Sequence, residues 1–351
     1  MTHISFPVGG YEGAIVWRFL DGVSSAVSAR MLRGSPPGEE NLTFLLCELL
    51  DANTTSLHAL AYPLAEAQKD LQASDSGIAI DIEFETHEHS KHIESKYSGA
   101  DIGIVVTINH PLLGNSRRGI LIQAKRLFGR GKSREFSFFS EYSSFDRGQA
   151  DFLKTLQNRF SAWNSVYYLW YNPPSVGFAE PEAKTIRAYE AHSTNGLPHW
   201  GRIHPFLDEL IGMGFPWFGS PRPASTADEE KAREWRATQP ALRISALDPV
   251  FSLFEHRPPR LKELYDSSLE DRSSSPSFAP FADFFLLALA SSRYGSANDD
   301  WVRLTEGQKV PMPLPKEPDE KALGAQGNFD HAPIPRHTIK LTVSSTLPNI
   351  G

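Results

Sequence analysis

The sequence contains a single cysteine, Cys47, among its 351 residues, which excludes an internal disulfide framework and fits a reducing compartment such as the cytoplasm. No apolar run approaches the ~18 residues that a membrane-spanning helix needs, and the N-terminus lacks the basic start of a secretory signal. An excess of positive charge is also absent, because the formal net charge is −7. Any surface that binds a polyanion must therefore be a local patch.

The densest chemical pattern surrounds two β-branched apolar runs, at residues 102–108 and 119–124. A His-Pro and a Gly-Asn-Ser segment lie between the runs, so this stretch is predicted to be a β-hairpin with a long loop. Asp101 stands at the start of the first strand, and Gln123 and Lys125 stand at the end of the second. Because Gln123 and Lys125 are two positions apart, they are expected to share one face of the strand.

An Asp, a hairpin and a Gln-x-Lys ending resemble the core of the PD-(D/E)XK nuclease superfamily. Gly99-Ala100-Asp101 and Gln123-Ala124-Lys125 match the GAD and QAK forms common in its Mrr-like restriction endonuclease branch, although Ala100 replaces the usual Pro. The resemblance covers roughly residues 38–175. It implies an α/β fold with a restriction-endonuclease-like mixed β-sheet flanked by helices, and the remaining chain adds a C-terminal helical or irregular region.

The resemblance also implies an activity, which is Mg²⁺-dependent (or Mn²⁺-dependent) endonuclease cleavage of DNA phosphodiester bonds in restriction or anti-phage defence. Its catalytic residues would be Asp101, Gln123, Lys125 and Glu40, of which Asp101, Glu40 and Gln123 would hold the metal. Magnesium prefers hard oxygen ligands, and here a neutral amide oxygen replaces the usual second acid. Lys125 would position the attacking water and stabilise charge at the phosphorus.

The choice of Glu40 depends on a predicted helix over residues 38–52, which carries Glu39 and Glu40 in its first turn. Either carboxylate can also simply complement the helix dipole. Because the superfamily aims an acidic residue of its first core helix at the metal, Glu40 is assigned that role here. Further acidic candidates are Glu48, Glu83, Glu85 and Glu94.

A basic stretch follows the proposed site, since residues 117–134 carry seven Lys or Arg residues and no Asp or Glu. Such runs are often only solvated surface, but this one flanks the acidic cluster in an acidic protein, and phosphate backbones need such patches. The predicted nucleic-acid-binding residues are Arg117, Arg118, Arg126, Arg130 and Lys132. A P-loop is excluded within this stretch, because Arg126 stands where the motif needs its first Gly.

Four segments are predicted along the chain. An N-terminal helix packs on the core (residues 1–37), the nuclease-like core follows (38–220), and then come a C-terminal helical extension (221–306) and a Pro-rich tail (307–351). Further helices are expected over residues 57–74, 148–163, 204–213 and 278–289, and strands over 77–85, 166–171 and near 186. A loop with His87, His89 and His92 lacks the spacing of a zinc site.

Two other classes remain open. One is a catalytically silent nucleic-acid-binding or scaffold protein that retains the nuclease fold, and the other is a different α/β enzyme, although no Gly-x-Ser-x-Gly elbow occurs. DNA is the expected partner, and no membrane is expected. Because no helix-turn-helix or zinc finger is evident, a protein partner that supplies targeting or activation is left open. A homodimer is left open as well, since cleavage of both strands by one kind of site calls for two copies.

Overall fold

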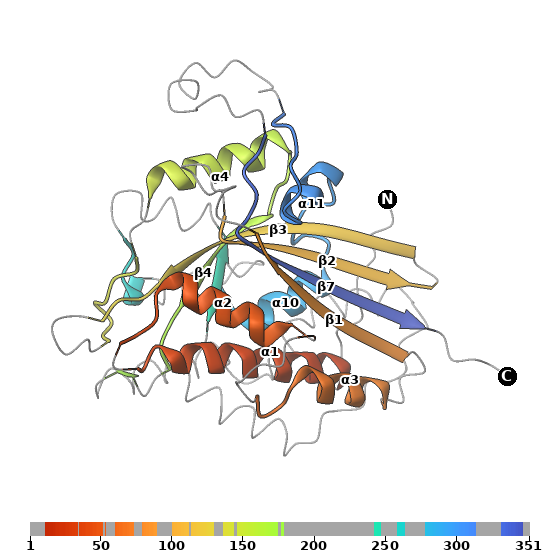
Figure 1. The fold of residues 1–351 in the computed structure, drawn as a ribbon, viewed down its shortest axis with the longest axis horizontal. Coiled ribbons are helices and arrows are strands. Elements are labelled where there is room, and N and C mark those ends of the chain that lie inside the picture. The colour runs from red at the N-terminus through yellow and green to blue at the C-terminus, as the bar shows by residue number, and fades with distance from the viewer. Residues whose placement is uncertain are drawn as a thin grey trace.

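The computed structural model is an α/β protein with a mixed β-sheet flanked by helices, as predicted (Figure 1). The described residues are 11–33, 35–51, 53, 60–73, 79–89, 100–111, 114–129, 136–143, 146–174, 177–178, 242–246, 258–263, 278–313 and 331–346. The expected strand near residue 186 and the expected helix over 204–213 lie outside them. Within them, no helix is long and apolar enough to cross a membrane.

The sheet has seven strands in the order β1-β7-β2-β3-β4-β5-β6. The predicted hairpin is confirmed, because β2 (Ile102–His110) pairs antiparallel with β3 (Gly114–Arg126). β3 then pairs in parallel with β4 (Val166–Tyr171). Two short strands, β5 (Arg243–Ala246) and β6 (Phe278–Pro280), complete that edge.

The other edge contains a strand from the far end of the chain. β7 (His337–Thr346) lies between β1 (Ala79–Glu88) and β2, antiparallel to the first and parallel to the second. Residues 307–351 were predicted to form a separate Pro-rich tail. In the structure, His337–Thr346 near the end of this segment form a strand inside the sheet. The alternation of Ile339, Leu341 and Val343 with polar residues fits an extended strand with one buried face, and pairing with β1 and β2 places that strand inside the sheet.

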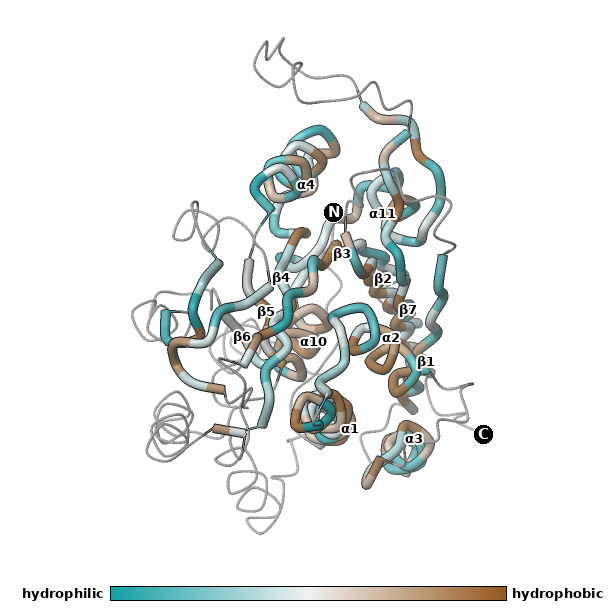
Figure 2. Tube along the Cα trace, turned by 60° about the vertical axis from the view of Figure 1, so that its left-hand side comes forward, coloured by the Kyte–Doolittle hydropathy of each residue, from teal (hydrophilic) through white to brown (hydrophobic). Residues whose placement is uncertain are grey.

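The helices form layers on both faces of the sheet. The predicted N-terminal helices are present as α1 (Tyr11–Arg30), α2 (Glu39–Leu50) and α3 (Leu64–Gln72) on one face. Figure 2 shows α2 and α10 (Phe281–Ala290) between the strands and α1, and both carry hydrophobic stretches. α4 (Arg147–Arg159) and α11 (Asp299–Thr305) lie on the opposite face (Figure 1).

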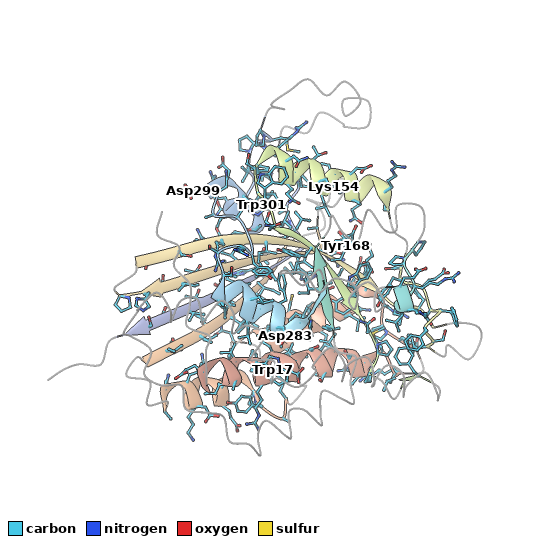
Figure 3. The ribbon with its side chains drawn as sticks, turned by 180° about the vertical axis from the view of Figure 1, so that it is seen from behind. Trp17, Lys154, Tyr168, Asp283, Asp299 and Trp301 are labelled. Atoms are coloured by element: carbon cyan, nitrogen blue, oxygen red, sulfur yellow. The ribbon has the colours of Figure 1, made fainter. Side chains whose placement is uncertain are left out.

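Two buried tryptophans tie helices to distant parts of the chain (Figure 3). Trp17 of α1 donates a hydrogen bond from Nε1 to Asp283 Oδ1 of α10 over 3.0 Å. Trp301 of α11 donates from Nε1 to the Gly119 carbonyl of β3 over 2.9 Å. Because each indole is buried and its N–H is satisfied, these contacts fix helix position as well as adding apolar burial.

Candidate functional site

The proposed site residues meet where the ladder between β2 and β3 ends. The Asp101 amide donates to the Ile122 carbonyl over 3.0 Å, directly before β2 begins at Ile102. The Ala124 amide then donates to Asp101 Oδ2 over 2.7 Å, so a side chain takes the place of a strand partner. β3 continues past this point because β4 pairs with it as far as Arg126. The carboxylate of Asp101 is thereby held at the fork between the two strands.

The side chain of Gln123 is held on both sides. Its Nε2 donates to Asp101 Oδ2, and its Oε1 accepts from Gln149 Nε2 of α4 over 2.7 Å. Gln123 itself is buried. In this arrangement its amide nitrogen, and not its oxygen, faces Asp101. An amide carries both a donor and an acceptor, so a joint turn of both glutamines would present the Gln123 oxygen to Asp101 and keep a bond to Gln149.

Asp101 carries an unusual proton affinity. Burial, and secondly the neighbouring carboxylate of Glu39, raise the pKa of Asp101 to about 7. Lys125, the Ala124 amide and Arg336 act in the opposite direction and lower this pKa. The site therefore concentrates negative charge that a nearby cation would stabilise. A titration this close to neutrality is typical of functional carboxylates, although structural networks can produce it as well.

Lys125 and Glu39 face each other beside this fork. Lys125 is buried, and its Nζ lies 3.9 Å from Glu39 Oε1. The other carboxylate oxygen, Glu39 Oε2, accepts from the Arg126 amide over 3.1 Å and from Ser143 Oγ over 2.7 Å. Two hydrogen bonds and one ion pair thus hold Glu39 at the end of the strand, so the helix carboxylate at the site is that of Glu39.

Glu40, which the sequence analysis placed at the metal, is directed elsewhere. Its Oε1 forms an ion pair with Arg336 Nη1 at 2.7 Å, and its side chain is 63% exposed. The rotation of α2 explains the difference. Glu39, Thr43 and Leu46 form one helical stripe, and Thr43 Oγ1 bonds to Tyr171 Oη of β4 over 2.8 Å, which turns that stripe toward the sheet.

The predicted basic surface is only partly available to a ligand. Arg118 is buried, and its guanidinium donates to the Ala288, Ser291 and Tyr294 carbonyls at the end of α10. Burial also lowers the pKa of Arg118 to about 10. It therefore caps a helix C-terminus and does not face a phosphate, which corrects its assignment to the nucleic-acid surface.

The other predicted cations differ in placement. Arg117 is about half exposed and forms an ion pair with Glu306. The Arg126 guanidinium lies 4.6 Å from the centre of the Phe128 ring, which is a cation–π contact. Arg130 and Lys132 lie outside the described residues.

The other acidic and histidine candidates that the structure describes lie elsewhere. Glu83 is on the exposed side of β1, Glu85 pairs with His87 and Lys340, and Glu48 lies in the last turn of α2. His89 bonds through Nε2 to Thr338 Oγ1 over 2.9 Å. His92 and Glu94 lie outside the described residues.

The donor set at the fork suits a hard divalent cation in its chemistry. Asp101 and Glu39 supply carboxylates, and the Gln123 amide oxygen can be presented by the turn described above. In the part of the chain that the structure describes, no cluster of three or more His, Cys, Asp or Glu side chains is placed to hold a metal. Any metal at the fork would thus depend on two carboxylates and neutral oxygens.

Comparisons of the chain with family models, with curated proteins and with solved structures found no significant match. The fold and the fork define an α/β protein with a half-buried Asp and a buried Gln and Lys at the end of a β-hairpin.

Proposed function

We propose that this protein is a metal-dependent deoxyribonuclease with a PD-(D/E)XK-like site of the Mrr-like type. One observation carries the proposal, namely that Asp101, Gln123, Lys125 and the helix carboxylate Glu39 meet at one strand fork. A buried lysine beside two carboxylates is costly unless the group has a task or a partner. Restriction or anti-phage defence is the setting that the resemblance suggests.

Asp101, Glu39 and Gln123 are the residues that would hold Mg²⁺ or Mn²⁺. A divalent cation there supplies charge neutralisation at the phosphorus and lowers the pKa of the attacking water. The Ala124 amide keeps Asp101 aimed at the fork, and Gln149 sets the orientation of the Gln123 amide. Glu39 is in turn fixed by the Arg126 amide and Ser143.

Lys125 has a separate task in this scheme. Its ammonium carries three N–H donors and lies beside Glu39 at the fork. There it can bind the attacking water and a non-bridging phosphate oxygen together. Glu39 holds the ammonium in place through the contact at 3.9 Å. Charge that develops on the phosphoryl oxygens is thus met by a preorganised cation.

The test is incubation of the purified protein with supercoiled plasmid, linear duplex and single-stranded DNA in magnesium, manganese or EDTA. We expect metal-dependent cutting that Asp101→Ala, Lys125→Ala and Glu39→Gln each reduce by at least about 100-fold, as losses of catalytic groups typically do. Glu66→Gln in α3 is the matched charge control and keeps full activity, since Glu66 is exposed and remote from the fork. Cutting that persists in EDTA or in Lys125→Ala would overturn the proposal.

A second candidate is a catalytically silent protein that binds nucleic acid or acts as a scaffold on the same fold. The observation that favours it is the direct bond from Gln123 Nε2 to Asp101, which satisfies the carboxylate with no metal. This candidate predicts DNA binding with a steep salt dependence and no cutting under any metal condition. The same set of incubations, combined with a binding titration, separates the two.

A further inference from the structure

Arg336 lies beside Asp101 although 235 positions separate them in the chain. Ile102 pairs with His337 in the parallel ladder of β2 and β7, so the residues before them are neighbours across the strands. Two main-chain bonds continue this register, from the His337 amide to the Asp101 carbonyl (2.9 Å) and from the Arg336 amide to the Ala100 carbonyl (3.3 Å). In a parallel pair, residues in register project to the same face.

Two cations therefore flank Asp101, one on each side. Lys125 comes from β3, and Arg336 comes from the residue before β7. Both lower the pKa of Asp101, which places their charges within electrostatic reach of its carboxylate. The resemblance to the nuclease core implies the lysine alone, because the strand that carries Arg336 comes from outside the matching residues 38–175.

The guanidinium of Arg336 is mostly covered, while its acidic partners are at the surface. The Arg336 side chain is 13% exposed, and Glu40, which binds Nη1, is 63% exposed. Glu88 is 50% exposed and lies 3.9 Å from Nη2. An exposed carboxylate contributes little to holding a cation, because water and salt screen the pair. A phosphate that enters the fork can therefore replace Glu40 at low cost.

We propose that Arg336 is a second phosphate-binding residue of the active site, and that Glu40 is the partner that holds it when no substrate is bound. The proposal rests on the proposed function. A guanidinium presents its N–H groups in a planar fork that matches two phosphate oxygens, which an ammonium cannot do. Lys125 and Arg336 then contact the phosphate from β3 and β7, and their positive charges offset the repulsion from Asp101 and Glu39.

The test measures the salt dependence of binding to a fluorescent 20-base-pair duplex and to the matching single strand, in EDTA so that no cutting occurs. Loss of one phosphate contact lowers the slope of log K against log salt by about 0.9 for duplex and about 0.7 for single strands. We expect this decrease for Arg336→Gln. Arg336→Lys keeps the slope but binds more weakly, because the charge remains and the planar fork is lost.

Glu40→Gln supplies the second variant, and it retains Arg336. It is expected to bind DNA several-fold more tightly, since the phosphate no longer competes with a carboxylate. Arg303→Gln in α11 is the matched control for loss of one arginine charge, because Arg303 is about half exposed and bonded to Asp300 and Gln308. It leaves both slope and affinity at their wild-type values.

The outcomes distinguish the two levels of the argument. If wild type binds and cuts DNA but Arg336→Gln keeps the wild-type slope, the proposal for Arg336 is wrong and the nuclease proposal stands. If both Arg336→Gln and Glu40→Gln lower the melting temperature and leave the affinity for DNA unchanged, the ion pair only stabilises the fold and the proposal for Arg336 is wrong. If wild type neither binds nor cuts, the proposed function fails, and the phosphate contact fails with it.

Discussion

At the scale of single residues, the site depends on which of two adjacent glutamates reaches the fork. Glu39 and Glu40 are chemically identical, and both stand in the first turn of α2. The bond from Thr43 to Tyr171 sets the rotation of the helix, and this places Glu39 beside Lys125 while Glu40 meets Arg336. A rotation of the helix by one residue, about 100°, would bring Glu40 to the place of Glu39.

The raised pKa of Asp101 predicts a stability that decreases with pH. An unfolded Asp ionises near pH ~3.9, whereas the folded chain keeps the Asp101 proton until about pH 7. Between these values the folded state binds more protons than the unfolded state, so the free energy of unfolding falls as the pH rises. The variant Asp101→Asn cannot ionise, so its free energy of unfolding does not fall in this way. We expect the variant to be more stable than the metal-free wild type by roughly 2 kcal/mol at pH 7.5 and by little at pH 4.5.

Thermal unfolding at both pH values in EDTA measures this difference. Asp300→Asn, at an exposed position of α11, is the control and shows no such pH-dependent gain. Manganese at pH 7.5 should then raise the melting temperature of wild type more than that of Asp101→Asn, because a ligand stabilises the state that binds it. An equal pH response in wild type and Asp101→Asn would show that Asp101 ionises normally in the folded protein.

At the scale of elements, α11 packs on the hairpin because two strand positions lack side chains. A Cβ at Gly103 would lie 2.1 Å from the Thr305 carbonyl oxygen, and a Cβ at Gly119 would lie 2.4 Å from Thr305 Oγ1 and 2.9 Å from its Cγ2. These distances are far inside van der Waals contact. The close approach lets Trp301 reach the Gly119 carbonyl. It thereby holds α11 against the same face of the hairpin to which Asp101 and Gln123 belong.

Gly119→Ala should accordingly destabilise the protein by about 1–3 kcal/mol through overpacking. The double variant Gly119→Ala/Thr305→Ala is expected to recover part of that loss, because the clashing atoms Oγ1 and Cγ2 are gone. Gly22→Ala in α1 is expected to stabilise the protein by up to about 1 kcal/mol. A Cβ at this position meets nothing within 4 Å, and alanine favours helices. Denaturant titrations of wild type, these three variants and Thr305→Ala give the values, and additive effects at positions 119 and 305 would contradict the packing argument.

At the scale of the whole molecule, the sheet depends on β7, a strand from the C-terminal part of the chain that lies between β1 and β2. β7 bonds to β1 on one side and to β2 on the other, so it connects the first strand to the hairpin that carries the site. Ile339, Leu341 and Val343 are buried in the common core. Residues before β7 also supply Arg336, so the end of the chain contributes to both the fold and the charge of the fork.

Removal of residues 331–351 is therefore expected to abolish cooperative unfolding. Two strands lose their ladders at once, which exceeds the net stability of about 5–15 kcal/mol that a typical domain has. Near-UV circular dichroism and a thermal melt report the loss, and truncation after Thr346 is the control that keeps all of β7. A peptide of residues 331–351 added to the shortened chain should restore the signal by strand addition. A shortened chain that still melts cooperatively would show that β7 is dispensable.

Local pattern alone was enough for the hairpin, the helices α1, α2, α4 and α10, and the meeting of Asp101 with Gln123. Strand alternation and helical spacing act over a few residues, and a hairpin brings its own ends together, so distant chain is not needed for these features. The catalytic roles and the metal of this site stay predictions. The position of β7, the burial of Arg118 under α10 and the choice of Glu39 over Glu40 were decided by tertiary packing. Each depends on contacts between residues more than a hundred positions apart, such as Thr43 with Tyr171 and Arg118 with Ala288, and no local pattern contains them.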